Sequence, residues 1–508
     1  MNKQPPKILA YLLPSFKDIL WMGAFFGVLF EGRQMMNGDG DLGRHLTLGR
    51  YILDNKAIPI NDIFSHTMTG QAMTPHEWLS QVLFASAERI LGLNGVILLS
   101  AFVIATAFWI VLKQSESKTQ SIFTAIFAGI FAVTTSMIHW LTRPHIFTFL
   151  LMALWMTVLH QMREGKVKRW WMLPILMLFW ANLHGAFIAG FVNWILFGIG
   201  IIFDKFWNNS TKEDGLPAAF WRYYLLGGVS SFLITFINPS GLGLWKTSVG
   251  YLGNKYLVDH TIEYQSPNFH SVNFWPFLFF FILLMFLMGL SNKKPKSTLL
   301  IVSAAWLGMS LYSARNIPLF GIVSAPLLAS VMDDLIHQTS SKFKFVKWFK
   351  GLDHRIKNME KNLPGILWPT MSIILIIVGA LLGVQVGSEE RRYAFDPEVF
   401  PVAAVDWLEN NPQEGEVFNY FTWGGYLLNR QWPEYLVFID GQTDFYGEAL
   451  TRQYMQVINL ENGWESVFEQ YGVDWAILPS DEIASRYIPV DLGWEIIYKD
   501  DTTTILHK

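Results

Sequence analysis

The chain has 508 residues, of which 52% are hydrophobic and only 16% are charged. Soluble domains average about 25% charged residues, so this is the composition of a membrane protein. The formal net charge of −3 gives no basis for a nucleic-acid partner, and the lack of cysteine excludes disulfides, thiolate metal sites and cysteine nucleophiles.

Apolar segments follow one another along most of the chain. A membrane span needs about 20 mostly apolar residues, and about eleven segments approach that requirement. They lie near residues 15–32, 94–112, 121–140, 146–162, 170–183, 186–203, 222–238, 273–290, 298–313, 317–332 and 366–386. No small-residue cleavage site follows the first, which indicates an uncleaved span rather than a signal peptide. The short segment 170–183 is either a tilted span or a re-entrant segment.

The connections between these segments differ in charge. Lys and Arg are abundant in alternate connections, at 113–118, 163–169, 291–297 and 342–361, and the mixed 204–222 connection falls on the same side. Cytoplasmic loops carry an excess of Lys and Arg, so we expect a cytoplasmic N-terminus, which carries Lys3 and Lys7, and an extracytoplasmic tail. The sequons at Asn208 and Asn209 would then face the cytoplasm. The aromatic residues among the lysines of 342–361 predict an amphipathic helix on the cytoplasmic surface.

The predicted outer connections hold the unusual polar residues, and the longest of them is the first loop at 33–93. Ionisable residues at a bilayer edge are costly unless paired or solvated, so together they predict a polar cavity that opens outward. Each residue taken alone is better explained as a helix cap or as the partner of a neighbour, whereas the whole set on one face is better explained by the cavity. The candidate site residues are Asp39, Asp41, Arg44, His45, His76, Glu77, Arg143, His145, His184, Glu263 and Arg315.

The first loop carries two acids in the stretch NGDGDLGRH at 37–45. A carboxylate in a cavity can act as a general base or bind a divalent cation such as Mg or Mn. Asp41 precedes LGRHLTLGRYIL, which has the apolar spacing of a helix, and we expect it to be the N-cap of that helix. A rigid carboxylate suits a catalytic base, so we assign that role to Asp41 and make Asp39 the metal ligand or second acid.

The stretch at 76–79 and two arginines limit the kinds of reaction that this cavity could catalyse. HEWL at 76–79 lacks the second histidine of H-E-x-x-H because Ser80 stands there, so it does not indicate a zinc protease. Arg143 and Arg315 stand at span mouths, and guanidinium groups bind phosphate well. Acids beside such arginines suit the transfer of a group from a lipid-phosphate donor to an acceptor, with the arginines stabilising the departing phosphate.

The composition changes near residue 388. We therefore divide the chain into a transmembrane domain at 1–387 and an extracytoplasmic domain at 388–508. A helix-like stretch at 402–411 precedes strand-like runs at 416–421, 435–440, 474–480 and 495–500, which predicts a small α/β domain. Within it, Trp423 and Tyr426 read as core residues, and Asp440 with Gly441 as a turn.

The order of a first span, a long acidic outer loop, many further spans and an outer C-terminal domain resembles the GT-C superfamily of integral membrane glycosyltransferases. This architectural resemblance implies a polyprenyl-phosphate sugar donor, a lipid, glycan or protein acceptor, and a catalytic acid at Asp39 or Asp41. The chain is also similar to a large group of bacterial multi-span proteins, through elements at 143–145, 182–185, 238–242, 265–267 and 315–320. The stretch 421–431 partly resembles the Trp-Trp-Asp-Tyr-Gly region of oligosaccharyltransferase catalytic subunits, but the central Asp is absent, so that role is not carried over.

The leading hypothesis is therefore a multi-pass glycosyltransferase of the inner or plasma membrane. A transporter or flippase would need ionisable or broken-helix sites near mid-membrane and often shows internal repeats. Here the polar residues cluster at span ends, and no repeat is visible. A non-catalytic assembly protein of an envelope polysaccharide system, whose tail binds a partner, remains an alternative that the sequence does not exclude.

The charge pattern makes a topological prediction. In intact cells, Ser117→Cys should be shielded from a membrane-impermeant thiol reagent and Ser480→Cys should react with it, because the natural chain has no cysteine and the two positions lie on opposite sides. The opposite labelling pattern would place the acidic loop in the cytoplasm and would contradict an outward-facing site.

Overall fold

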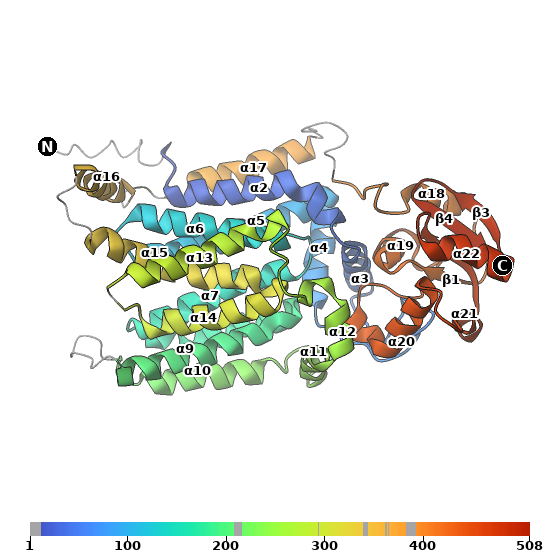
Figure 1. Ribbon diagram of the computed structural model, residues 1–508, viewed down its shortest axis with the longest axis horizontal. Helices are drawn as coiled ribbons and strands as arrows, with labels where there is room; N and C mark the ends of the chain where they lie inside the picture. The colour runs from blue at the N-terminus through green and yellow to red at the C-terminus, as the bar shows by residue number, and fades with distance from the viewer. Residues whose placement is uncertain are drawn as a thin grey trace.

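The computed structural model describes residues 12–207, 216–292, 294–338, 344–360, 363, 365–382 and 393–508. A helical bundle occupies one end of the molecule and a smaller domain with a sheet occupies the other (Figure 1). Every predicted apolar segment coincides with a helix of the bundle. These helices are α2 Phe16–Asn37, α5 Leu93–Glu116, α6 Ile122–Ser136, α7 His145–Arg163, α8 Met172–Leu183, α9 Ile188–Trp207, α10 Phe220–Ile234, α13 Trp275–Leu290, α14 Ser297–Tyr312, α15 Ile317–Gln338 and α17 Leu367–Leu381.

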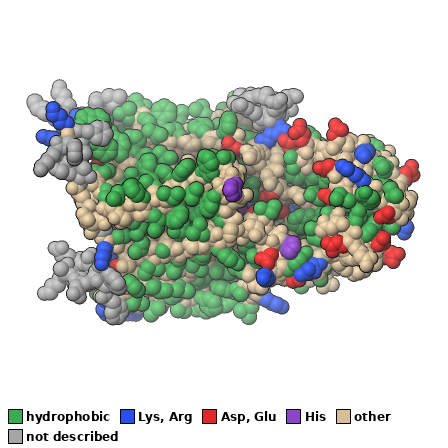
Figure 2. Space-filling model, viewed as in Figure 1, with side chains coloured by type: hydrophobic (Ala, Val, Ile, Leu, Met, Phe, Trp, Pro, Cys, Tyr) green, Lys and Arg blue, Asp and Glu red, His purple; other side chains and the backbone are tan. Residues whose placement is uncertain are grey.

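Six helical stretches of the described residues are long and apolar enough to cross a membrane. They are Leu93–Glu116, Ile122–His139, His145–Arg163, Gly185–Lys205, Val272–Leu290 and Ala314–Gln338. The other bundle helices are shorter or less apolar, so the count of eleven spans stays a prediction. Apolar side chains cover the bundle surface, whereas acidic side chains gather over the smaller domain (Figure 2). Large side chains such as Phe286 and Leu375 are more than half exposed, which a membrane environment explains.

The two ends of the bundle differ in the connections that they carry. At the end away from the sheet, Lys118 forms an ion pair with Glu164, and Arg163 Nη2 lies 2.5 Å from Asp204 Oδ2. The predicted amphipathic helix is α16, Lys344–Glu360, at this same end (Figure 1). The connections predicted to be cytoplasmic therefore share one end, and the side of the membrane that it faces remains the prediction. Lys3, Lys7, Asn208, Asn209 and the proposed boundary at 387 and 388 lie outside the described residues.

The first loop forms two helices, α3 Asp41–Asn55 and α4 Trp78–Leu91. Helix α3 confirms the helix predicted from its apolar spacing, but the N-cap is Gly40 and no side chain caps the helix. The expectation that Asp41 caps α3 is therefore wrong. Asp39 Oδ1 instead accepts a hydrogen bond of 3.0 Å from the backbone N–H of Asp41, because a short acidic side chain can bond the backbone two residues ahead.

The smaller domain has a four-stranded sheet in the order β1-β2-β4-β3. Its strands are β1 Glu416–Asn419, β2 Val473–Pro479, β3 Glu495–Lys499 and β4 Thr503–His507, and its helices are α18 Val402–Asn410, α19 Gly424–Gln431, α20 Thr443–Ile458, α21 Glu465–Tyr471 and α22 Ile483–Leu492. β1 pairs with β2 in parallel, and the other two pairings are antiparallel. The predicted α/β character is correct.

The structure also bears on the cysteine-labelling experiment. Ser480 is partly buried in this domain, whereas Asn410 is exposed, so Asn410→Cys offers a second labelling position.

One predicted strand is wrong. The 435–440 run joins no sheet, and its backbone meets the first loop instead through a bridge between Ser65 and Val437. Val437 donates to Phe64 O at 3.0 Å and accepts from the backbone N–H of His66 at 3.1 Å. The apolar run is buried between the first loop and the core of the C-terminal domain, where Phe438 packs against Phe418. The sequence pattern also missed β4.

Helix α3 lies between the bundle and the C-terminal domain (Figure 1), where glycines let two backbones touch. A Cβ atom on Gly43 would overlap the carbonyl of Gly425, and one on Gly425 would overlap the carbonyl of Gly40. The glycines of GDGDLG and of WGGY are therefore the two sides of one contact between α3 and α19. Trp423 and Tyr426 are buried in the core, as expected.

Two further helices, α11 Gly243–Gly253 and α12 Lys255–His260, extend from the bundle toward the C-terminal domain (Figure 1). Short 3-10 turns complete the connections. They are η1 Met137–His139, η2 Val167–Trp171, η3 Gly185–Phe187, η5 Ile262–Tyr264, η6 Val272–Phe274, η7 Ala314–Asn316 and η9 Phe421–Trp423.

The glycine contact is testable. Gly43→Ala should destabilise the protein by about 1–3 kcal/mol, because the added methyl forces two packed backbones apart. The measurement is the midpoint of thermal unfolding of the purified protein in detergent. Gly308→Ala is the matched control, since Gly308 is also helical and has nothing within 4 Å of an added Cβ. Equal stability of the two variants would contradict this packing.

Candidate active site

A cavity of about 430 Å³ lies where the bundle meets the C-terminal domain. Its wall combines the first loop, the start of α7, the ends of α8 and α14, and residues 441–444 of the C-terminal domain. Eight of the predicted site residues line it: Asp41, Arg44, His45, His76, Glu77, Arg143, His184 and Arg315. The structure thus brings these groups together around one cavity, and their roles and the side of the membrane that the cavity faces stay predictions.

Arg143 is the centre of the charged part of this cavity. Its Nη1 lies 3.2 Å from Asp39 Oδ2 and 2.9 Å from Glu263 Oε1, and its Nη2 lies 2.5 Å from Asp41 Oδ2. Asp39 and Glu263 do not line the cavity themselves but reach it through this guanidinium. Three carboxylates from the first loop and η5 therefore share one positive charge.

These contacts shift the acidity of the partners. Burial raises the pKa of Asp39 to about 6, with further raising by Asp41 and Glu263, against the opposing effect of Arg143. Burial also raises the pKa of Glu263, but Arg143, His139 and Arg315 outweigh it and hold that pKa well below its usual range. Asp39 therefore takes up a proton more readily than Glu263 does.

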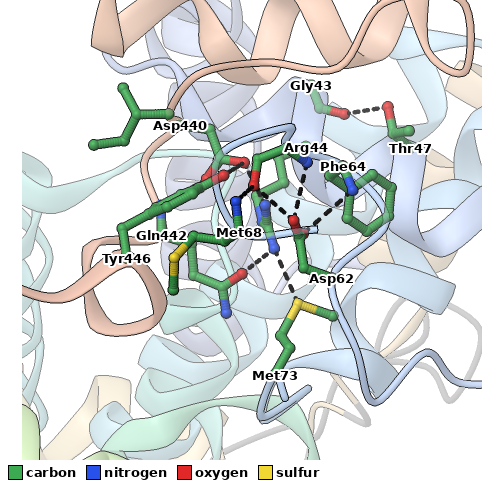
Figure 3. A network of polar contacts seen from close by, with 12 residues as sticks. Gly43, Arg44, Thr47, Asp62, Phe64, Met68, Met73, Asp440, Gln442 and Tyr446 are labelled. Atoms are coloured by element: carbon green, nitrogen blue, oxygen red, sulfur yellow. Dashed lines mark hydrogen bonds and ion pairs between the residues drawn. The ribbon is translucent and has the colours of Figure 1, made fainter. Parts of the chain in front are cut away.

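Arg44 lies on the first-loop side of the cavity but points to the C-terminal domain (Figure 3). Its guanidinium forms an ion pair with the fully buried Asp440 and a hydrogen bond with the Gln442 side chain. Tyr446 Oη also donates to Asp440 at 3.1 Å. Asp440 is thus more than the turn residue that the sequence indicated. Because Arg44 is fully engaged, its geometry suits attachment of the domain better than the substrate binding that we predicted.

A group of histidines surrounds Glu77, which also lines the cavity. His76 Nε2 and His184 Nε2 lie 3.8 and 3.7 Å from its Oε1, and His45 Nδ1 lies 4.0 Å from its Oε2. His76 Nδ1 lies 3.7 Å from Asp444 of the C-terminal domain. Burial lowers the pKa of His76, but Asp444 and Glu77 outweigh it and raise that pKa above its usual value. Sequence analysis missed Asp444, which no motif marks.

His145 and Arg315 differ from their expected settings. His145 does not line the cavity, and its Nε2 hydrogen-bonds to His139 O at 2.8 Å, so its contacts are structural. Arg315 lines the cavity, with Nη1 2.5 Å from Tyr264 Oη and its guanidinium carbon 5.0 Å from the centre of that ring. Among the described residues Arg315 forms no ion pair with a carboxylate, so its charge is available to a ligand.

One wall of the cavity is apolar. It is formed by α9, α14 and α15 through Ala189, Val192, Trp306, Met309 and Leu319. These residues sit inside apolar helices, where nothing in the sequence separates a cavity-lining side chain from one that faces lipid. The cavity therefore joins a charged end to an apolar end.

The described residues do not form a site for the divalent cation that we expected. Carboxylate oxygens of Asp39, Asp41 and Glu263 are the donors that Mg or Mn would take, but all three contact Arg143. Among the described residues, no group of three or more His, Cys, Asp or Glu is arranged to hold a metal ion. Because Arg143 occupies these oxygens, the residues present do not fit the metal-ligand role that we predicted for Asp39, and we derive no step through a metal.

No protein-family model matches the chain, and no curated protein matches it. The chain is similar to the Archaeoglobus fulgidus oligosaccharyltransferase in its apo form, with a TM-score of 0.56, 12% identity, and coverage of 91% of this chain and 69% of that one. The complex of that AglB protein with an inhibitory peptide and a dolichol-phosphate gives a TM-score of 0.57 with the same identity and coverage. ArnT from Cupriavidus metallidurans gives 0.49, with 14% identity over 96% of this chain and 97% of that one.

The likeness to the oligosaccharyltransferase extends over most of the chain, while its low identity carries no residue roles. The architecture expected from the order of spans, acidic loop and C-terminal domain is thereby confirmed. The chain therefore shares the fold of that oligosaccharyltransferase over most of its length.

Proposed function

We propose that the protein is a membrane glycosyltransferase that moves a sugar from a polyprenyl-phosphate-linked donor to an acceptor on the outer face of the membrane. The observation that supports this best is the two-part cavity within a GT-C fold. A lipid-phosphate sugar needs an apolar wall for its first prenyl units, a cation for its phosphate and an acid near its sugar. This cavity offers all three.

The donor phosphate is assigned to Arg315. A guanidinium binds phosphate through two parallel N–H donors, and Arg315 has no carboxylate partner among the described residues. Arg143 also lines the cavity, but three carboxylates already share its charge. The prenyl chain would lie along Trp306, Met309 and Leu319. The dolichol-phosphate bound to the similar AglB protein is a ligand of this class.

Asp41 is assigned as the general base. It lines the cavity at the start of α3, and the ion pair with Arg143 orients its carboxylate. In the reaction it would take the proton of the acceptor hydroxyl or amide as the acceptor attacks the anomeric carbon. The bond to the polyprenyl phosphate breaks, and Arg315 stabilises the negative charge that develops on the leaving phosphate. Asp39 positions Asp41 through its hydrogen bond to the Asp41 backbone.

The acceptor is expected to enter between the bundle and the C-terminal domain. Thr443 and Asp444 line the cavity from that domain, opposite His76 and Glu77. A lipid, glycan or protein acceptor is compatible with this opening. The C-terminal domain thus contributes directly to the proposed site.

The proposal predicts the effect of removing one charge. Asp41→Asn should lower transfer by about 10²-fold or more, because the amide cannot take up the acceptor proton. Since Asp41 makes no side-chain cap, this loss would not reflect an altered start of α3. Purified protein in lipid nanodiscs would receive a panel of radiolabelled polyprenyl-phosphate monosaccharides and an envelope extract as acceptor, and the label transferred would be counted.

Asp54→Asn is the matched control, because Asp54 is an exposed acid near the end of the same helix. It should retain full activity. If Asp41→Asn is fully active and Asp39→Asn is inactive, the two roles are reversed. If both variants are active, the first-loop acids are not the catalytic centre and the proposed function loses its main support.

A further inference from the structure

The contacts of Arg143 have a consequence beyond the proposed transfer reaction. Residues 39, 41, 143 and 263 come from three separate connections, yet the guanidinium of Arg143 touches a carboxylate oxygen of each acid. Each of the four side chains is only about one-quarter exposed or less. Three partly buried acids without a cation among them would repel one another strongly.

A divalent ion and this guanidinium would compete for the same oxygens. Asp39 Oδ2 and Glu263 Oε1 contact the same nitrogen, Nη1, while Asp41 Oδ2 contacts Nη2. The positive charge thus sits where the three acids meet. A guanidinium is planar, carries several N–H donors in a fixed arrangement and does not lose its proton in proteins, so it can hold several carboxylates in place permanently.

We propose that Arg143 is a built-in substitute for a divalent cation: it clamps Asp39, Asp41 and Glu263 in place, and the site works without Mg²⁺ or Mn²⁺. The functional part of this inference rests on the proposed transferase activity, whereas the occupation of the acids by Arg143 does not. Arg143 is a positioning residue in this scheme. It sets the direction of the Asp41 carboxylate and balances part of the charge of the three acids.

The arrangement predicts what the acids do when the guanidinium is removed. Arg143→Ala leaves three carboxylates facing a common space, and oxygen donors of this kind bind Mn²⁺. This variant should therefore gain Mn²⁺ affinity, by about tenfold or more over the wild type. Arg143→Lys keeps a positive charge among the acids and should not gain it.

The experiment titrates Mn²⁺ alone into purified, chelator-treated protein in nanodiscs and follows free Mn²⁺ by electron paramagnetic resonance. Arg315→Ala is the matched control, because it removes a cation from the same cavity that contacts Tyr264 rather than a carboxylate. Wild type, Arg143→Lys and Arg315→Ala should leave the Mn²⁺ signal unchanged. Arg143→Ala should reduce it, and its monodispersity and thermal midpoint would be checked in parallel.

A second arm measures transfer by the wild type with and without EDTA, which should give equal rates. Tight Mn²⁺ binding by the wild type, or loss of transfer in EDTA that Mn²⁺ restores, would overturn the proposal. Absence of Mn²⁺ binding by a folded Arg143→Ala would also overturn it. If that variant does not fold, the wild-type titration still tests the proposal, because tight Mn²⁺ binding by the wild type would contradict it. A wild type that transfers no sugar and binds no Mn²⁺ would contradict the proposed function while leaving the clamp by Arg143 in place.

Discussion

The buried ion pair between Arg44 and Asp440 is the interaction on which the geometry of this protein depends (Figure 3). Both side chains are almost fully buried, so each charge would be unpaired in an apolar setting if its partner were lost. Breaking a buried pair in this way typically costs about 3–5 kcal/mol. The pair joins the first loop to the C-terminal domain, and the close approach of Gly43 to Gly425 leaves little freedom in how the two fit together.

The contact between the first loop and the C-terminal domain also forms part of the cavity wall. Asp444 belongs to the C-terminal domain, but it lies 3.7 Å from His76 of the first loop. The same contact brings Gly441 against Asp41, so the candidate base lies under the C-terminal domain at the cavity wall. A C-terminal domain held only by a flexible connection would not complete this wall, and the candidate base would be open to water.

The two arginines at the span mouths have different surroundings and therefore suit different tasks. Arg143 contacts three acids, so its charge holds their carboxylates in place. Arg315 rests on Tyr264, so its charge is available to an incoming anion. A fold alone does not specify a reaction. This separation of an engaged and an available guanidinium, next to an apolar wall, is what favours a lipid-phosphate donor.

The local features and the chemical character of the protein could be predicted from its amino-acid sequence. Apolar runs of span length predicted the bundle helices, the spacing of leucines predicted α3, and the placement of ionisable residues in alternate connections predicted their meeting at one end of the bundle. These predictions succeed because the periodicity of apolar residues, the length of apolar segments and the charge of the connections act locally or through the bilayer.

Which groups contact one another could not be predicted in this way, because it depends on how distant parts of the chain pack. The position of Gly40 as the N-cap in place of Asp41 depends on how the chain enters α3, and the 435–440 run is not a strand because the first loop pairs with it. Asp440 and Asp444 carry no recognisable spacing relative to Arg44 and His76, about 400 and 370 residues away along the chain. Contacts between residues so far apart depend on how the domains pack, so the spacing of residues along the sequence does not predict them.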